Sequence, residues 1–181
     1  MKFFKILLIT FIALTVSVKA DLKKNLNEGG KLIFIRHAYA PGNGDPSNFN
    51  LNDCLTQRNL SDRGRKQAKI IGNIFSKNNV SLSGIFSSEW CRCKETAKIA
   101  FKNFSTNSFL NSFYSYKFAK NKKKQIDALK DYVDKFKSNK NLVLITHYVV
   151  ISEVLNYGPA SGEIVVSDKN FNIIGTIEIN Y

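Results

Sequence analysis

Apolar residues follow one another without polar interruption in the clearest strand-like segments of this chain. Such runs cover residues 31–36 and 142–146, and a shorter run covers 84–87. Uninterrupted apolar runs are typical of strands that are buried on both faces, as in parallel sheets. Two further β-rich runs, 163–166 and 172–179, are joined by a polar segment, which predicts a hairpin near the end of the chain.

Apolar residues recur at helical spacing between these runs. Four helices are predicted, one beginning after Ser61 and the others over 89–101, 125–136 and 149–155. The Ser61 hydroxyl can accept a hydrogen bond from the first turn and so cap the first of these helices. The segment 38–58 is polar and contains two prolines and two glycines, which predicts a loop.

The alternation of strands and helices predicts the fold. We expect an α/β three-layer sandwich, in which a mostly parallel central sheet is flanked by helices and followed by a C-terminal β-hairpin. Ligands of such sheets bind beyond the carboxyl ends of the strands. Side chains that directly follow the strands are therefore the first candidates for a functional site.

The first twenty residues have the features of a secretory signal peptide. A basic start precedes an apolar stretch at 6–18, and the Val-Lys-Ala sequence at 18–20 fits a cleavage site. The stretch is short for a transmembrane helix, which needs ~20 apolar residues. We predict a signal peptide at 1–20 and a single mature domain at 21–181, periplasmic or secreted, without stable membrane insertion after cleavage. An uncleaved N-terminal anchor is the alternative.

The chain carries a formal net charge of +13, and removal of the leader with its three lysines leaves +10. This surplus suits anionic partners such as phosphorylated substrates, acidic polysaccharides, lipid head groups or nucleic acid. The alternative interpretation is a lysine-rich composition that keeps the protein soluble, and the run at 120–124 fits it as a solvated helix start. We expect no specific nucleic-acid partner.

The three cysteines are Cys54, Cys91 and Cys93. Export places them in a compartment where disulfides persist. Cys91 and Cys93 are too close along the chain for a relaxed bridge, so we expect Cys54 to pair with one of them. Such a bridge would tie the loop at 38–58 to the helix at 89–101. A Cys-x-Cys pair without further cysteines or a nearby histidine is a poor zinc site.

The chain has two histidines, and each directly follows a predicted strand. His37 follows Arg36 at the end of the first run, and His147 follows the run at 142–146. Arg92 lies shortly after the run that ends at residue 87. Because these positions meet at one edge of a parallel sheet, we expect a cationic pocket that can hold a phosphate group.

These residue types suit phosphoryl transfer. Guanidinium groups offset the charge of a phosphoryl group and fix its oxygens by paired hydrogen bonds. A neutral imidazole is nucleophilic, and with a reference pKa of ~6.5 much of it is neutral at pH 7. We therefore assign His37 as the nucleophile that forms a phosphohistidine. Arg36 and Arg92 would clamp the phosphoryl oxygens, and His147 would add a donor. Because these cations are side chains, we expect no metal and no cofactor.

Four segments resemble the histidine phosphatase (phosphoglycerate mutase-like) superfamily. Residues 35–38 are similar to its Arg-His-Gly signature, and 57–65 to its Leu-Thr-x-x-Gly element. Residues 85–97 are similar to its Ser-Ser-x-x-x-Arg-x-x-x-Thr-Ala element, and 142–147 to the strand that delivers its second histidine. Their common order and intervals make the resemblance specific over nearly the whole mature chain. The resemblance implies the α/β fold and the phosphatase or mutase chemistry of that superfamily.

The chain departs from the superfamily pattern at several positions. Ala38 and Tyr148 stand where glycine is usual, and Ala38 would be strained in a left-handed backbone. No acidic residue stands in the segment 104–120 or directly after the second histidine, where better-known members carry the proton donor. We expect Glu163 to be this acid, ahead of Glu89, with water as the alternative for good leaving groups.

The leading prediction is an exported phosphomonoesterase of the histidine acid phosphatase type. The candidate substrate contacts are Arg58, Ser88, Glu89 and Tyr148, of which Tyr148 either narrows the pocket or only packs. The short chain shows no large inserted cap, which favours a small or exposed phosphorylated substrate such as an envelope sugar phosphate or a phosphoprotein. The alternatives are a phosphoglycerate mutase-like phosphotransferase and a non-catalytic module that binds phosphate.

Overall fold

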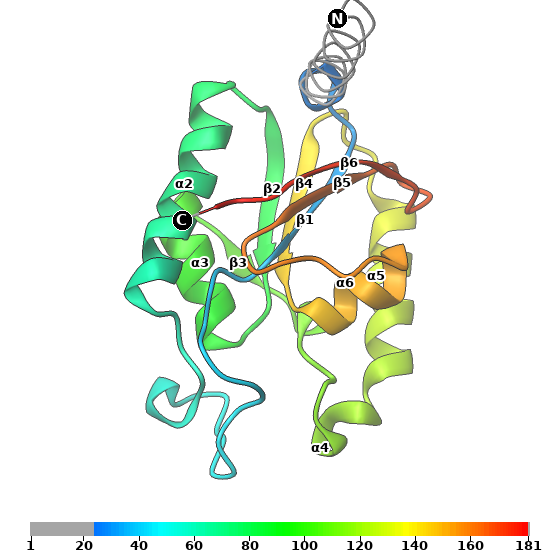
Figure 1. The fold of residues 1–181 in the computed structure, drawn as a ribbon. Coiled ribbons are helices and arrows are strands. Elements are labelled where there is room, and N and C mark those ends of the chain that lie inside the picture. Colours follow the sequence, from blue (N-terminus) through cyan, green and yellow to red (C-terminus); the bar gives the residue numbers. More distant parts are fainter. Residues whose placement is uncertain (1–23, 181) are drawn as a thin grey trace, which may run out of the picture.

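The computed structural model describes residues 24–180, and the predicted signal peptide at 1–20 lies outside these residues (Figure 1). Six strands form one sheet in the order β3-β2-β4-β1-β5-β6. Their bounds are β1 Leu32–Arg36, β2 Leu82–Ser87, β3 Ser105–Thr106, β4 Asn141–Thr146, β5 Ile164–Ser167 and β6 Ile173–Ile177. Strands β3, β2, β4 and β1 run parallel to one another, and β5 and β6 add the antiparallel C-terminal hairpin.

Helices cover both faces of this sheet. Their bounds are α2 Asp62–Lys77, α3 Cys91–Phe101, α4 Tyr116–Ala119, α5 Lys122–Lys135 and α6 Tyr148–Leu155, with 3-10 turns η1 Cys54–Thr56 and η2 Ser108–Leu110. Helices α2 and α3 lie on one face, and α5 and α6 lie on the other (Figure 1). The predicted three-layer sandwich is confirmed, with element bounds that differ by a few residues. Within residues 24–180, no helix is long and apolar enough to cross a membrane.

Strand residues point alternately to the two faces, and both faces are covered. Ile33 and Ile35 of β1 belong to the core that also contains Ile71 of α2. Phe34 faces the other way and belongs to a second core with Leu129 of α5. The uninterrupted apolar runs of the sequence therefore follow from burial of the strands on two sides.

Strand pairing places the two histidines next to each other. Arg36, the last residue of β1, is the register partner of Thr146, the last residue of β4. The backbone N–H of His37 donates to the carbonyl oxygen of Thr146 at 2.9 Å. Because β2 pairs with the other side of β4, the segment 88–92 reaches the same edge of the sheet.

Helix α2 packs closely on the chain that follows His37. Ser61 caps this helix as predicted, since its Oγ accepts a hydrogen bond from the backbone N–H of Gly64. A Cβ at Gly64 would lie 2.1 Å from the carbonyl oxygen of Tyr39, so glycine permits the close approach. The side chain of Gln67 accepts from the backbone N–H of Tyr39 at 2.9 Å and fixes the same segment.

A disulfide joins Cys54 of η1 to Cys91 at the start of α3, with 5.7 Å between the Cα atoms. Of the two pairings that the sequence left open, the structure therefore has the one with Cys91. Cys93 is a buried free thiol, and burial raises its pKa to about 12. The bridge ties the loop at 38–58 to the residue directly before Arg92.

Replacing both Cys54 and Cys91 by serine is expected to lower the free energy of unfolding by about 3–4 kcal/mol, because the bridge spans 37 residues of chain. Urea unfolding followed by circular dichroism measures this difference. The Cys93→Ala variant serves as the control that keeps the bridge. A reductant should weaken the wild type and this control but not the double variant, and a double variant as stable as the oxidised wild type would contradict the prediction.

Candidate active site

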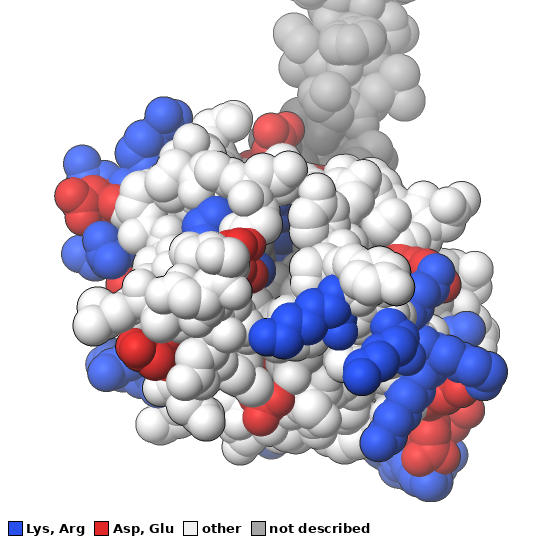
Figure 2. All heavy atoms as spheres, turned by 90° about the horizontal axis from the view of Figure 1, so that it is seen from below, with Lys and Arg blue, Asp and Glu red and all other residues white. Residues whose placement is uncertain are grey.

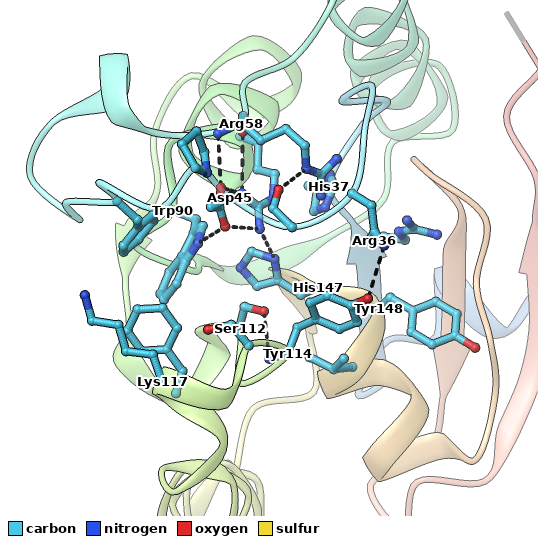
Figure 3. Close-up of a pocket in the computed structure, with 18 of the residues that line it drawn as sticks. Arg36, His37, Asp45, Arg58, Trp90, Ser112, Tyr114, Lys117, His147 and Tyr148 are labelled. Atoms are coloured by element: carbon cyan, nitrogen blue, oxygen red, sulfur yellow. Dashed lines mark hydrogen bonds and ion pairs between the residues drawn. The ribbon is translucent and has the colours of Figure 1, made fainter.

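A cavity of about 500 Å³ opens at the carboxyl edge of the sheet. It is lined by residues from the loop at 38–58, from the segment 112–118 and from the ends of β1 and β4. Of the nine candidate residues from the sequence, six line this cavity, namely Arg36, His37, Arg58, Arg92, His147 and Tyr148. The two imidazole rings lie 5.5 Å apart between centroids. Figure 3 shows their side chains beside those of the arginines.

The hydrogen bond of His37 leaves one ring nitrogen free to act as a nucleophile. Its Nδ1 lies 2.9 Å from the carbonyl oxygen of Ala38. Because a carbonyl only accepts, Nδ1 carries the proton and Nε2 carries the lone pair. Burial lowers the pKa of His37 well below 6.5, and the charge of Arg92 lowers it further. Ala38 is not among the residues with positive φ, so alanine replaces the usual glycine there without strain.

His147 is fixed on both ring nitrogens. Its Nδ1 faces Nη2 of Arg92 at 3.4 Å, and because Arg92 can only donate, Nδ1 accepts. Nε2 then carries the proton and donates to Oγ of Ser88 at 2.9 Å. The indole ring of Trp90 packs against the imidazole edge-on, with 5.4 Å between ring centroids. Burial and then the charge of Arg92 lower the pKa of His147 well below 6.5, so this ring is also neutral.

Asp45, which the sequence did not predict as a site residue, forms an ion pair with Arg92. Asp45 accepts from Nη1 of Arg92 at 2.7 Å and from Nη2 at 3.3 Å, so both carboxylate oxygens are engaged. Asp45 also accepts from the indole N–H of Trp90 and the backbone N–H of Arg58, each at 3.0 Å. Burial alone would raise the pKa of Asp45, but these donors and the charge of Arg92 hold it below its ordinary value. Asp45 is therefore a fixed counter-ion at the centre of the site.

Two further arginines make the cavity strongly cationic. Arg36 donates from Nη1 to the carbonyl oxygen of Pro159 at 2.9 Å and lies over the ring of Tyr148, 5.4 Å from its centroid. Arg58 donates from Nε to the carbonyl oxygen of Gly44 at 2.8 Å. Burial lowers the pKa of both arginines, and the charge of Arg92 lowers it further. The Nε atoms of Arg36 and Arg92 are buried without a hydrogen-bond partner among the described residues.

The structure does not bring Glu163, Glu89 or Ser88 into the lining of this cavity. Both carboxylate oxygens of Glu163 accept hydrogen bonds at 2.6 Å, one from the hydroxyl of Tyr157 and one from the backbone N–H of residue 160. The carboxylate of Glu89 accepts from Nδ2 of Asn111 at 2.6 Å. Glu163 therefore stabilises its own turn, and Ser88 lies behind His147 as its hydrogen-bond partner.

Asp45 carries the one carboxylate among the described residues that line the cavity. Asp45 lies in a glycine- and proline-rich loop. Such a loop has no periodic pattern, so the pairing of Asp45 with Arg92 could not be predicted from the sequence. Within residues 24–180, no three His, Cys, Asp or Glu side chains lie together in a group that could hold a metal ion. The basic groups that line the cavity are guanidinium groups, imidazoles and the ammonium group of Lys117.

Acid is expected to destabilise the protein because both imidazoles are neutral when folded. The unfolded chain takes up protons near pH ~6.5, whereas the folded chain does so only at a lower pH, so this contribution to stability is complete above pH ~6.5 and is lost below it. The free energy of unfolding should fall by about 1.4 kcal/mol per pH unit for each histidine. Urea unfolding between pH 7.5 and 5 measures the slope, and the His37→Asn/His147→Gln double variant should flatten it. Equal slopes in the two proteins would contradict the prediction.

Asp45→Asn is expected to bind inorganic phosphate about tenfold more tightly than the wild type. The carboxylate takes paired hydrogen bonds from Arg92 that an oxyanion also needs, and its charge repels an anion bound nearby. Isothermal titration calorimetry at constant pH and salt measures the dissociation constant. Asp127→Asn on the exposed face of α5 is the matched control. Weaker binding in Asp45→Asn would show that the carboxylate holds Arg92 for the anion rather than competing with it.

Residues 32–111 match the family model of the histidine phosphatase superfamily (branch 1). The structure of protein histidine phosphatase SixA complexed with tungstate has a TM-score of 0.54 at 12% identity, covering 83% of this chain and 94% of that chain. Phosphoglycerate mutase from Thermus thermophilus has a TM-score of 0.57 at 17% identity, covering 83% and 99%. A His-to-Ala variant of phosphoserine phosphatase from Entamoeba histolytica, in complex with phosphoserine, has a TM-score of 0.55 at 19% identity, covering 75% and 89%.

At these identities the solved structures show a shared fold, and a comparison with curated proteins gives no match. The family model covers the segment from β1 to η2, which includes His37, Arg58 and Arg92. The chain is therefore similar to the histidine phosphatase superfamily (branch 1) over residues 32–111, and it shares the fold of the solved phosphatases and the phosphoglycerate mutase named above.

Proposed function

We propose that this protein is an exported phosphomonoesterase that acts through a phosphohistidine on His37, without a metal ion. The observation that carries the proposal is the state of His37, a buried neutral imidazole whose Nε2 lone pair is free beside three arginines. A neutral imidazole is the nucleophilic form, and guanidinium groups offset the charge of an incoming phosphate ester.

In the first step, Nε2 of His37 attacks phosphorus, an N–P bond forms and the P–O bond to the leaving group breaks. Arg36, Arg58 and Arg92 offset the charge on the phosphoryl oxygens. The leaving oxygen takes its proton from water, because Glu163 and Glu89 do not line the cavity and Asp45 is held as a carboxylate. Water then attacks the phosphohistidine, which releases inorganic phosphate and restores neutral His37.

His147 would contribute once the substrate is bound. Its Nε2 is engaged with Ser88 at 2.9 Å, whereas Nδ1 has only the longer contact of 3.4 Å with Arg92, so Nδ1 would be the nitrogen that turns to a phosphoryl group. Protonation of Nδ1 beside a phosphate dianion would turn this nitrogen into a donor. The ring contact with Trp90 and the bond to Ser88 keep the imidazole in place for this role.

Export is proposed from the leader at 1–20, and the disulfide between Cys54 and Cys91 is in keeping with an oxidising compartment. A periplasmic or secreted location would remove the protein from glycolytic intermediates, which favours hydrolysis over a mutase reaction. Its substrate would be a small or exposed phosphate ester, such as a phosphorylated envelope sugar or a phosphoprotein.

The neighbours named above include a protein histidine phosphatase, a phosphoserine phosphatase and a phosphoglycerate mutase. These activities share phosphoryl chemistry and differ in the group that carries the phosphate. One observation favours a non-catalytic phosphate-binding module as the second candidate, namely that no acid among the described lining residues is protonated for the leaving group.

The wild type is expected to hydrolyse p-nitrophenyl phosphate in the presence of EDTA, and His37→Ala should lower kcat/KM by at least about 1,000-fold because the nucleophile is lost. His37→Ala should still bind inorganic phosphate, since the arginines remain. Ser83 does not line the cavity, so Ser83→Ala is the control for activity that is lost during purification and assay. Activity that requires a divalent metal or survives in His37→Ala would contradict the mechanism, and phosphate binding without hydrolysis of any ester would favour the binding module.

A further inference from the structure

A second cavity adjoins the candidate active site. It has a volume of about 400 Å³ and shares Phe49, Trp90, Ser112 and Phe118 with the first cavity. Phe49 stacks on Trp90 with 5.1 Å between ring centroids, and Phe118 meets Trp90 edge-on at 5.4 Å. The three rings form one aromatic cluster that is a wall of both cavities. A ligand in the second cavity would therefore lie beside the group that is bound in the first.

The second cavity combines this aromatic wall with neutral polar side chains. These are Asn107, Ser108, Asn111, Ser112, Asn121 and Gln125. Hydroxyl and carboxamide side chains both donate and accept hydrogen bonds, as the hydroxyl groups of a saccharide do. The carbon face of a sugar ring is apolar enough to pack on aromatic rings. Lys124 adds a positive charge, and no carboxylate is among the described residues of this lining.

One buried acceptor in this lining is unpaired. Gln125 is 9% exposed, and its Nε2 donates to the carbonyl oxygens of Ser108 at 2.8 Å and Asn111 at 3.0 Å. These bonds hold the amide in one orientation. Its Oε1 has no hydrogen-bond partner within the described part of the chain. A buried acceptor without a donor is unfavourable. Because Oε1 itself is covered, a hydroxyl group of a ligand would supply that donor once the Gln125 side chain shifts towards the cavity.

We propose that the second cavity binds a saccharide unit of the substrate while the ester phosphate of the same molecule occupies the first cavity. This inference rests on the proposed function and specifies its substrate class as a phosphorylated saccharide larger than one sugar ring. The volume falls in the range of ~300–1,000 Å³ that is typical of small-ligand sites. Lys124 suits a sugar that carries a further acidic group.

A hydrogen-bond path connects the second cavity to the catalytic histidine. Asn111 lines the second cavity, and its Oδ1 accepts from Oγ of Ser88 at 3.0 Å and from the backbone N–H of Glu89 at 2.9 Å. Ser88 in turn bonds to Nε2 of His147. Asn111 therefore joins the wall of the second cavity to the fixed ring of His147 in the first, so the two cavities share one rigid hydrogen-bonded wall.

The surface around the two cavities suits an anionic saccharide. Lys117 at the first cavity and Lys120 near the second are exposed, as are the lysines at 122–124. Figure 2 shows this side of the molecule, with charged atoms in a recess and a group of Lys and Arg side chains on the surface next to it. Long basic side chains on this surface would attract acidic sugars from solution.

The test uses Ala128, an exposed residue that lines the second cavity but not the first. Ala128→Phe fills that cavity, and Ala119→Phe, an exposed position on α4 that lines neither cavity, is the matched control. The substrates are p-nitrophenyl phosphate, trehalose 6-phosphate and a phosphoserine peptide. Ala128→Phe should lower kcat/KM for trehalose 6-phosphate at least tenfold and leave p-nitrophenyl phosphate within twofold. The control should behave as the wild type on all three.

Trp90 gives a second measurement that does not need turnover. It is the single tryptophan of the chain and lines both cavities. Trehalose added in the presence of saturating inorganic phosphate should change its fluorescence in the wild type and in Ala119→Phe but not in Ala128→Phe. Equal trehalose 6-phosphate kinetics in both variants, no fluorescence change, or a selective loss for the peptide would each overturn the inference. Absence of hydrolysis with the fluorescence change intact would instead overturn the proposed function alone.

Discussion

The site depends on one constraint: two buried imidazoles lie beside three arginines, and burial together with the arginine charges lowers the pKa of both rings. Arg92 is adjacent to both rings, and its charge adds to burial in lowering the pKa of His37 and of His147. Burial and these charges together keep His37 neutral, and under the proposed function the same charges would attract a phosphate ester. Parallel pairing of β1 and β4 makes this possible, because it brings both rings to one edge of the sheet.

Asp45 moderates this concentration of positive charge. It accepts two hydrogen bonds from Arg92, and the loop that carries it is tied to α3 by the Cys54–Cys91 bridge. A site with uncompensated arginines would hold inorganic phosphate, the product of hydrolysis, as readily as an ester. Under the proposed function, an internal carboxylate that competes for Arg92 would reduce the affinity for both anions and so favour release of the product. The disulfide ties the loop of Asp45 to the residue next to Arg92, which keeps the two side chains close together.

Much of the fold and the core of the site could be predicted from the sequence. Uninterrupted apolar runs indicated strands buried on both faces, and the rule that parallel strands present their carboxyl ends at one edge placed Arg36, His37 and His147 together. Asp45 could not be found, because its position depends on a loop without periodicity. Glu163 was expected in the cavity, yet its carboxylate is consumed by hydrogen bonds within its own turn, which sequence spacing does not show. The aromatic wall was also missed, since Trp90 lies within the predicted helix at 89–101 and its ring partners Phe49 and Phe118 come from distant segments of the sequence.

Chemical trapping of the intermediate tests the central claim most directly. The wild type is mixed with ³²P-labelled phosphate ester, quenched within milliseconds in alkali and mapped by mass spectrometry of its peptides. Phosphate that is stable in base, labile in acid and located on His37 is the predicted result, with none in His37→Ala. Phosphate on a serine or on His147, or turnover without any phosphorylated enzyme, would contradict it.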